Sequence, residues 1–265
     1  MKLPSAFLLC LLTTAMLFVA IAESSAPEDP SDAELAAISE RGRQLAEYDG
    51  AAWQATDALM AARPAEDRLG SYVARKTEAG WAVAFGRLDE AGEKFLVTYE
   101  AVSKGKKAKF EVKGFDPPRE DTGWNLATAR GIQTARKDFG PLSRPYNHAV
   151  LAAEQGELYV YLYPAQTKED VYPLGGDVRY RVSPDGTRII DKRQMHKTII
   201  EMTTRQKGVK TEHGWHTHVL SVLPEDTDVL MVLIRKPRIP EYIGAGAYLF
   251  AIDVDGEISW DYLRR

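Results

Sequence analysis

The spacing of hydrophobic residues is helical in the first part of the chain that follows the N-terminal apolar run. From residue 31 to about residue 63, apolar side chains recur at helical spacing in an alanine-rich segment that Asp49-Gly50 interrupts. The segment begins with Ser31-Asp32-Ala33-Glu34, in which the serine hydroxyl and the glutamate carboxylate can cap each other's backbone N–H groups. This pattern predicts two helices before Pro64.

Beyond Pro64 apolar and polar residues alternate, which is the spacing of strands. A helix from about Thr122 to Asp138 interrupts this region, with Asp121 as its expected N-cap and Gly140-Pro141 at its end. Tight hairpin turns are predicted at Pro184-Asp185-Gly186 and Asp255-Gly256. The predicted strands are YVARKTE, WAVAFGRLD and KFLVTYEAV before this helix, and ELYVYLYPA, DVRYRVS, TRIIDKR, HVLSVL, DVLMVLIRK, AYLFAID and EISWDYL after it.

These elements predict an α+β fold in which N-terminal helices are followed by a mostly antiparallel β-sheet. The connections are short, and strands and helices do not alternate regularly as they do in a doubly wound parallel sheet. We expect residues 31–265 to form one α+β domain. A subdivision near residue 140 is the alternative.

The N-terminus has the pattern of a secretory signal peptide. Lys2 precedes an almost uninterrupted apolar run from Ala6 to Ile21, which ends in the small-residue sequence Ala20-Ile21-Ala22. The run is short for a membrane span, so we expect a periplasmic or secreted protein with no span after cleavage; an uncleaved anchor is the alternative. The prediction divides this part into a signal peptide over residues 1–22 and a flexible leader over 23–30.

Composition excludes several kinds of chemistry. The only cysteine, Cys10, lies in the predicted signal peptide, so the mature chain would lack disulfides, thiolate ligands and a cysteine nucleophile. The formal net charge is −4 with acids and bases interspersed, which does not indicate a nucleic-acid partner. The one basic cluster, from Lys104 to Lys109, is interpreted as a solvated hairpin loop.

Three of the five histidines lie in EHGWHTHVL, residues 212–220. If this segment is extended, His216 and His218 point to the same side, because strand side chains repeat every two residues. Two imidazoles on one side can bind one zinc ion, whereas His213 is out of step and is placed in the turn with Gly214. Asp228 is the candidate third ligand.

The remaining histidines, His148 and His196, are interpreted as polar groups satisfied within the β-rich half of the chain. His196 would join the pocket of His216 and His218 only if its segment paired with theirs.

Residues 214–228 resemble the JAMM (JAB/MPN-type) zinc metallopeptidases, whose signature is His-x-His-Pro followed by Pro-Ser-x-x-Asp. The resemblance implies that the zinc ligands are His216, His218 and Asp228. Val219 and Glu225 stand where that family has proline and serine. The family also uses an upstream glutamate as base toward the zinc-bound water, for which the candidates are Glu154, Glu157 and Glu201.

A row of tyrosines is the second candidate feature. Tyr159, Tyr161 and Tyr163 alternate with aliphatic residues, so they share one face of a predicted strand. Such a row can be a binding surface for carbohydrate or peptide, because rings offer a large contact area and hydroxyls form hydrogen bonds. The commoner arrangement is one layer of a packed sheet.

The chain as a whole resembles uncharacterised exported proteins of Gram-negative bacteria, in VYPLGGDVRYRVSPDG and HTHVLSVLPEDTDV. The resemblance implies export and no particular activity. We therefore expect an exported protein that acts as a non-catalytic binding or accessory module. The alternative is a zinc-dependent hydrolase that uses His216, His218 and Asp228, and the sequence leaves open whether the protein is an enzyme.

Overall fold

The first helix, α1, spans Asp32–Ala61 without a break. The computed structural model describes residues 29–103, 109–203, 205–206 and 209–263. The predicted capping box is confirmed, with the Ser31 hydroxyl accepting a hydrogen bond from the Glu34 backbone N–H. The predicted division into two helices is wrong. Asp49 accepts a hydrogen bond from the Tyr163 hydroxyl at 2.8 Å, which ties the middle of α1 to a sheet, and one interior glycine costs only about 1 kcal/mol.

A four-stranded antiparallel sheet follows, in the order β1-β2-β3-β4. Its first three strands agree with the predicted ones, whereas β4 was not predicted. Its strands are β1 (Ser71–Thr77), β2 (Gly80–Leu88), β3 (Phe95–Val102) and β4 (Glu111–Asp121), after the short helix η1 (Glu66–Arg68). Helix α2 (Trp124–Phe139) follows, and its N-cap is Gly123 rather than the predicted Asp121, whose carboxylate accepts from the Gly123 N–H.

Two further four-stranded sheets form the rest of the fold, in the orders β5-β6-β8-β9 and β13-β14-β15-β16. Every strand pair is antiparallel except β13 and β14, so the predicted α+β fold with mostly antiparallel sheets is confirmed. The central sheet contains β5 (Tyr146–Ala152), β6 (Leu158–Pro164), β8 (Val178–Val182) and β9 (Ile189–Gln194), with η2 (Glu154–Gly156) between its first two strands. The C-terminal sheet contains β13 (Gly214–His218), β14 (Glu241–Ala245), β15 (Tyr248–Ile252) and β16 (Ile258–Tyr262).

Shorter strands form two further two-stranded sheets. They are β7 (Val171–Gly175), paired with β10 (Ile199–Thr203), and β11 (Arg205–Gln206), paired with β12 (Val209–Lys210). The two predicted hairpin turns are confirmed: Gly186 closes the turn between β8 and β9, and Gly256 closes the turn between β15 and β16.

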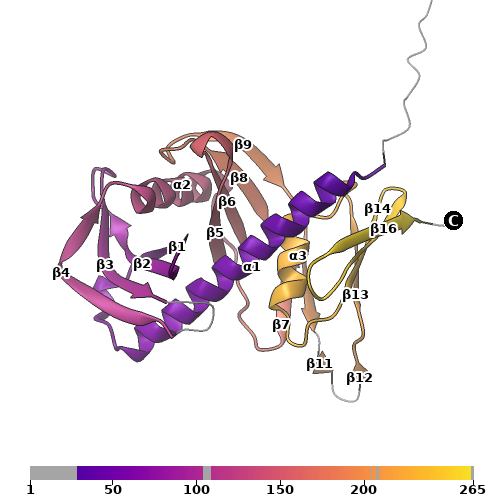
Figure 1. Ribbon diagram of the computed structural model, residues 1–265, viewed down its shortest axis with the longest axis horizontal. Coiled ribbons are helices and arrows are strands. Elements are labelled where there is room, and N and C mark those ends of the chain that lie inside the picture. Colours follow the sequence, from indigo (N-terminus) through magenta and orange to yellow (C-terminus); the bar gives the residue numbers. More distant parts are fainter. Residues whose placement is uncertain (1–28, 104–108, 204, 207–208, 264–265) are drawn as a thin grey trace, which may run out of the picture. The chain divides into compact units, whose positions relative to one another are not determined.

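Helices cover both faces of the central sheet (Figure 1). Because side chains alternate along a strand, Tyr161 and Tyr163 of β6 lie in the core formed with α1, and Val160 and Leu162 lie in the core formed with α2. In Figure 1, α1 crosses from β1–β4 at its C-terminal end to β14 and β16 at its N-terminal end. One long helix therefore contacts the first and the last part of the domain.

The apolar segment DVLMVLIRK is a helix and not the predicted strand. Helix α3 spans Asp226–Ile234, and its first turn is closed by hydrogen bonds between Glu225 and Asp228. A short apolar run that is buried on all sides does not reveal its period, because the residues on every face are apolar. Here Val229 and Val232 are buried in the core that α3 shares with α1 and the C-terminal sheet. The predicted strand HVLSVL, residues 218–223, is also wrong: β13 spans Gly214–His218, so only the first residue of the predicted segment lies in a strand, and Val219 is 77 % exposed.

Contacts within the chain join Ser31–Arg265 into one unit, with no division near Gly140. Among the residues that the structure describes, none of the helices has the length and apolarity needed to cross a membrane. Residues 1–28, which include the predicted signal peptide, and residues 104–108, which form most of the basic cluster, lie outside the described residues.

Candidate metal centre

Three histidines and one aspartate converge from three parts of the fold. His216 and His218 lie on β13 and turn to its buried side as their spacing predicts, while the intervening Thr217 is exposed. Asp228 lies in the first turn of α3, and His196 lies just after β9. One ligand atom from each of the four lies within 4.8 Å of all the others, and all four residues are buried. The three predicted ligands are thus brought together, with His196 as a fourth.

The distances within this group, which we call the His₃Asp cluster, are those of a metal coordination shell. His218 Nε2 lies 2.9 Å from Nε2 of His196 and 3.1 Å from Nε2 of His216. Asp228 Oδ1 lies 3.1 and 3.2 Å from Nε2 of His196 and His216, and its Oδ2 lies 3.3 Å from that of His218. Four ligands at about 2.0 Å from a zinc ion in a tetrahedron are about 3.3 Å from one another. These five contacts are close to the spacing that zinc requires, and the four ligand atoms as a set lie within 4.8 Å of one another.

The outer nitrogen of each imidazole faces a hydrogen-bond acceptor. Nδ1 of His196 lies 2.8 Å from an Asp177 carboxylate oxygen, and Nδ1 of His216 lies 2.8 Å from one of Glu241. Nδ1 of His218 lies 2.8 Å from the backbone oxygen of Leu223. A carbonyl or an ionised carboxylate only accepts, so these contacts place a proton on every Nδ1. Metal-binding histidines are held in this way, because the arrangement directs the Nε2 lone pair at the ion.

With neutral imidazoles and no bound ion, the centre of the cluster would be repulsive. With protons on the Nδ1 atoms only, the imidazoles direct their Nε2 lone pairs at one another across 2.9 and 3.1 Å. In this protonation state the buried Asp228 Oδ1 has no hydrogen-bond donor, although two Nε2 atoms lie near it. A buried oxygen without a donor is costly, and a metal ion would bind this oxygen and all three lone pairs together.

The carboxylates around the cluster favour positive charge at its centre. Burial opposes a charge on His196, but Asp228 and Asp177 outweigh it and raise the pKa of His196 to about 11. Burial likewise opposes a charge on His216, but Asp228 and Glu241 raise its pKa to about 9. Although burial alone would raise the pKa of Asp228, the histidines around it hold that pKa well below its ordinary value. In the absence of a metal these raised pKa values correspond to a second proton on His196 and on His216, so the carboxylates draw positive charge into this buried space as protons or as a metal ion.

A count of formal charges shows how much positive charge is needed. The acidic residues in or against the cluster carry four negative charges, and two arginines that pair with them carry two positive charges. A divalent cation bound by neutral histidines, or protonation of His196 and His216, would balance the remaining two negative charges. The residues counted are Asp177, Glu225, Asp228 and Glu241 with Arg193 and Arg235.

His148 differs from the cluster histidines, because both of its ring nitrogens have hydrogen-bonding partners that are not part of a ligand group. Its Nε2 lies 2.9 Å from the Tyr72 backbone oxygen, its Nδ1 lies 3.3 Å from a guanidinium nitrogen of Arg136, and its ring stacks on Tyr72. Burial lowers the pKa of His148 to about 4, and the nearby Arg136 charge acts in the same direction. Both nitrogens have protein partners and the ring stays neutral, as expected for His148 from the sequence.

His196 is likewise buried and bonded to a protein group, Asp177, but it also lies in the cluster, which the sequence had left open. Its segment does not pair with β13; His196 reaches the cluster because the chain turns inward after β9. Asp177 and Glu241, which orient His196 and His216, were also missed, because no regular spacing in the sequence links them to the histidines. The shared side of His216 and His218 was predictable from their spacing, and Asp228 was a candidate through the resemblance.

The other candidate residues lie elsewhere. His213 is exposed and contacts the ring of Tyr242. Of the candidate bases, Glu157 pairs with Arg181, Glu201 pairs with Arg144 and Lys168, and Glu154 is exposed in η2.

The tyrosine row does not form an open surface. Tyr161 and Tyr163 are 0 % and 5 % exposed beneath α1, and only Tyr159 is partly exposed. Their hydroxyls donate to Asp226 and Asp49 at 2.8 Å. These rings therefore pack within the sheet layer, because the face of β6 that carries them is covered by α1.

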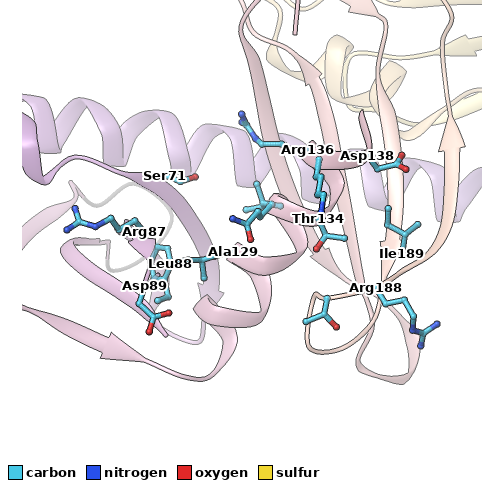
Figure 2. A pocket seen from close by; sticks show the side chains of 16 residues that line it. Ser71, Arg87, Leu88, Asp89, Ala129, Thr134, Arg136, Asp138, Arg188 and Ile189 are labelled. Carbon is cyan, nitrogen blue, oxygen red and sulfur yellow. The ribbon is translucent and has the colours of Figure 1, made fainter. Parts of the chain in front are cut away.

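A larger hollow, of about 1650 Å³, lies between α2 and the hairpins β2–β3 and β8–β9 (Figure 2). Its two acidic residues are already bonded, Asp138 to Lys192 and Asp89 to backbone N–H groups of its own turn. The side chains of Arg87 and Arg188 extend away from each other in Figure 2. No set of polar side chains converges among the residues that line this hollow, so the His₃Asp cluster is the candidate functional site.

Comparison with protein-family models, curated proteins and solved structures gave no match to this chain.

We expect the charge of Asp177 to strengthen metal binding through His196. Asp177→Asn keeps an oxygen that can accept from Nδ1 but removes the charge that makes the imidazole a better ligand. Zinc affinity, measured by competition with a chromophoric chelator, should fall by about 10- to 100-fold. Asp191→Asn, an exposed position on β9, is the matched control and should leave the affinity unchanged. Equal affinities for the two variants would contradict the role of Asp177.

Proposed function

We propose that the protein is an exported zinc-binding protein in which one ion, held by His196, His216, His218 and Asp228, cross-links three parts of the fold. The observation that carries the proposal is that four buried residues each offer a ligand atom within 4.8 Å of the others, with contacts of 2.9 to 3.3 Å between their imidazole nitrogens and carboxylate oxygens. The ion would join the β9–β10 connection, β13 and the first turn of α3.

The ligand set favours zinc over other common divalent ions. Calcium and magnesium bind oxygen ligands, six to eight for calcium and an octahedron for magnesium, whereas three of the four ligand atoms here are imidazole nitrogens. Imidazole suits zinc, copper, iron and nickel, and a compact four-ligand shell of nitrogen and oxygen is the usual arrangement for zinc.

The arrangement supports a site with four protein ligands and a non-catalytic role. Catalytic zinc usually has three protein ligands and a water molecule, whereas structural zinc has four protein ligands. His196 supplies the fourth ligand here, beside the three that the JAMM resemblance implies. The three candidate glutamates for the base lie elsewhere in the fold, and the carboxylates beside the ligands are bonded to histidine or arginine. These features favour the binding or accessory module over the hydrolase.

The metal content of the purified mature protein tests the proposal. We expect about one zinc ion per chain by elemental analysis, and its loss in the double variant His216→Ala, His218→Ala. His213→Ala is the matched control, because this exposed histidine lies in the same stretch of sequence but outside the cluster. Zinc well below one per chain, or zinc retained by the double variant, would refute the proposed site.

Export is the second part of the proposal and rests on residues 1–22. Cleavage after Ala22 predicts that the protein recovered from the periplasm of a Gram-negative host begins at Glu23. An intact N-terminus on the recovered protein would favour the uncleaved anchor.

A further inference from the structure

A narrow cavity of about 40 Å³ lies against the His₃Asp cluster. His196, His216 and His218 all line it, and Asp228 does not. Its other walls come from the end of β7, the β9–β10 connection, β10 and the segment that follows β13. The lining residues used below are Lys197, Ile200 and Leu220.

The position of this cavity gives a bound ion one accessible side. A tetrahedral ion has four triangular faces, and the face opposite Asp228 is bounded by the three imidazole nitrogens. A cavity walled by all three histidines, but not by Asp228, lies on the side of that face. We propose that the ion of the His₃Asp cluster accepts a fifth ligand from this cavity, opposite Asp228, and that this ligand is a small anion. The inference rests on the proposed zinc site.

The size of the cavity limits the ligand. A cavity needs a volume of roughly 10 to 15 Å³ to hold one water molecule. A cavity of 40 Å³ therefore accommodates about three non-hydrogen atoms. A peptide or a sugar does not fit. The ligand class is therefore water or a compact species such as azide or cyanide, which sets this site apart from a peptidase centre.

The charges around the cavity favour an anion. A divalent ion balances the buried charges of the cluster, so an added anion needs one more positive charge nearby. Lys197 lines the cavity and is itself exposed, and the structure shows no acidic partner for it within the described residues. Its ammonium group can thus attract an anion to the mouth of the cavity without first breaking an ion pair.

Cobalt(II) in place of zinc makes the fifth ligand visible. We expect the full mature chain to bind one cobalt ion with the intense visible absorption of four-coordinate cobalt. Added azide should weaken and shift these bands with a saturable dependence, because five-coordinate cobalt absorbs less. If cobalt binds and azide leaves the spectrum unchanged, the further inference is refuted while the zinc site stands. If no cobalt or zinc binds, both proposals fail.

Variants at the cavity test the route of the anion. Ile200 is 47 % exposed and lines the cavity, so Ile200→Trp should block it and abolish the azide response while cobalt remains bound. Val222→Trp is the matched control, since Val222 is similarly exposed but does not line this cavity. Lys197→Gln should weaken azide binding about threefold, as expected for one exposed charge. Leu220→Trp serves as a second blocking variant if Ile200→Trp loses cobalt. An azide response that survives in a cobalt-loaded blocked variant would overturn the assignment.

Discussion

The zinc-loaded protein should unfold at a temperature about 10 °C higher than the same protein after chelation. The ion would bind only the folded state, because its ligands meet only there. Apart from His216 and His218, consecutive ligands are 10 or more residues apart in the sequence. Free zinc at about 1,000 times its dissociation constant stabilises the folded state by about 4 kcal/mol. For a domain of this size, each kcal/mol raises the unfolding temperature by about 2–4 °C.

Differential scanning calorimetry with and without a chelator measures this effect, and restored zinc should return the transition to its original position. The His213→Ala variant should show the same difference as the unaltered chain. His196→Ala should unfold near the temperature of the chelated protein and respond little to zinc. An unfolding temperature that is the same with and without the chelator would show that the ion does not cross-link the fold.

The second large effect is expected at Asp226, which lies close to the His₃Asp cluster on α3 but bonds to another set of partners. Its Oδ1 accepts from Arg41 of α1 at 3.0 Å, and its Oδ2 accepts from Arg179 of β8 at 2.7 Å and from the Tyr161 hydroxyl at 2.8 Å. Asp226→Ala would leave two partly buried cations close together and a buried hydroxyl without its acceptor. Removing one member of a buried ion pair typically costs about 3–5 kcal/mol, and the partial exposure of the arginines places this case near the lower value.

Urea denaturation of the zinc-loaded protein measures the loss at Asp226. The control is Glu257→Ala, which removes an exposed carboxylate from its ion pair with Arg43, also on α1, and should cost less than about 1 kcal/mol. Zinc content should remain at one ion per chain in the folded Asp226→Ala protein, because Asp226 is not a ligand. Equal losses in the two variants would show that the buried network does not hold α1, α3 and the central sheet together.

Local features of the fold were predictable from the sequence. The Ser31–Glu34 capping box, the alternating strands, and the hairpin turns at Gly186 and Gly256 depend on residues that are close in sequence. The errors arose where distant contacts override local preference. Gly50 remains helical because α1 is bonded to β6 through the neighbouring Asp49. The apolar run at residues 226–234 is helical because it packs between α1 and the C-terminal sheet.

The candidate site was likewise predictable from the sequence only in part. The shared side of His216 and His218 follows from their spacing alone, because the period of two is a property of the extended backbone. Asp228 was a candidate through a resemblance of about 15 residues. The packing of the folded chain was needed to show that Asp228 meets these histidines from a helix, that His196 joins them, and that Asp177 and Glu241 orient the rings. A coordination shell is built from elements far apart in sequence, so its contacts are set by the packing of α3 and the sheets and not by the spacing of residues along the chain.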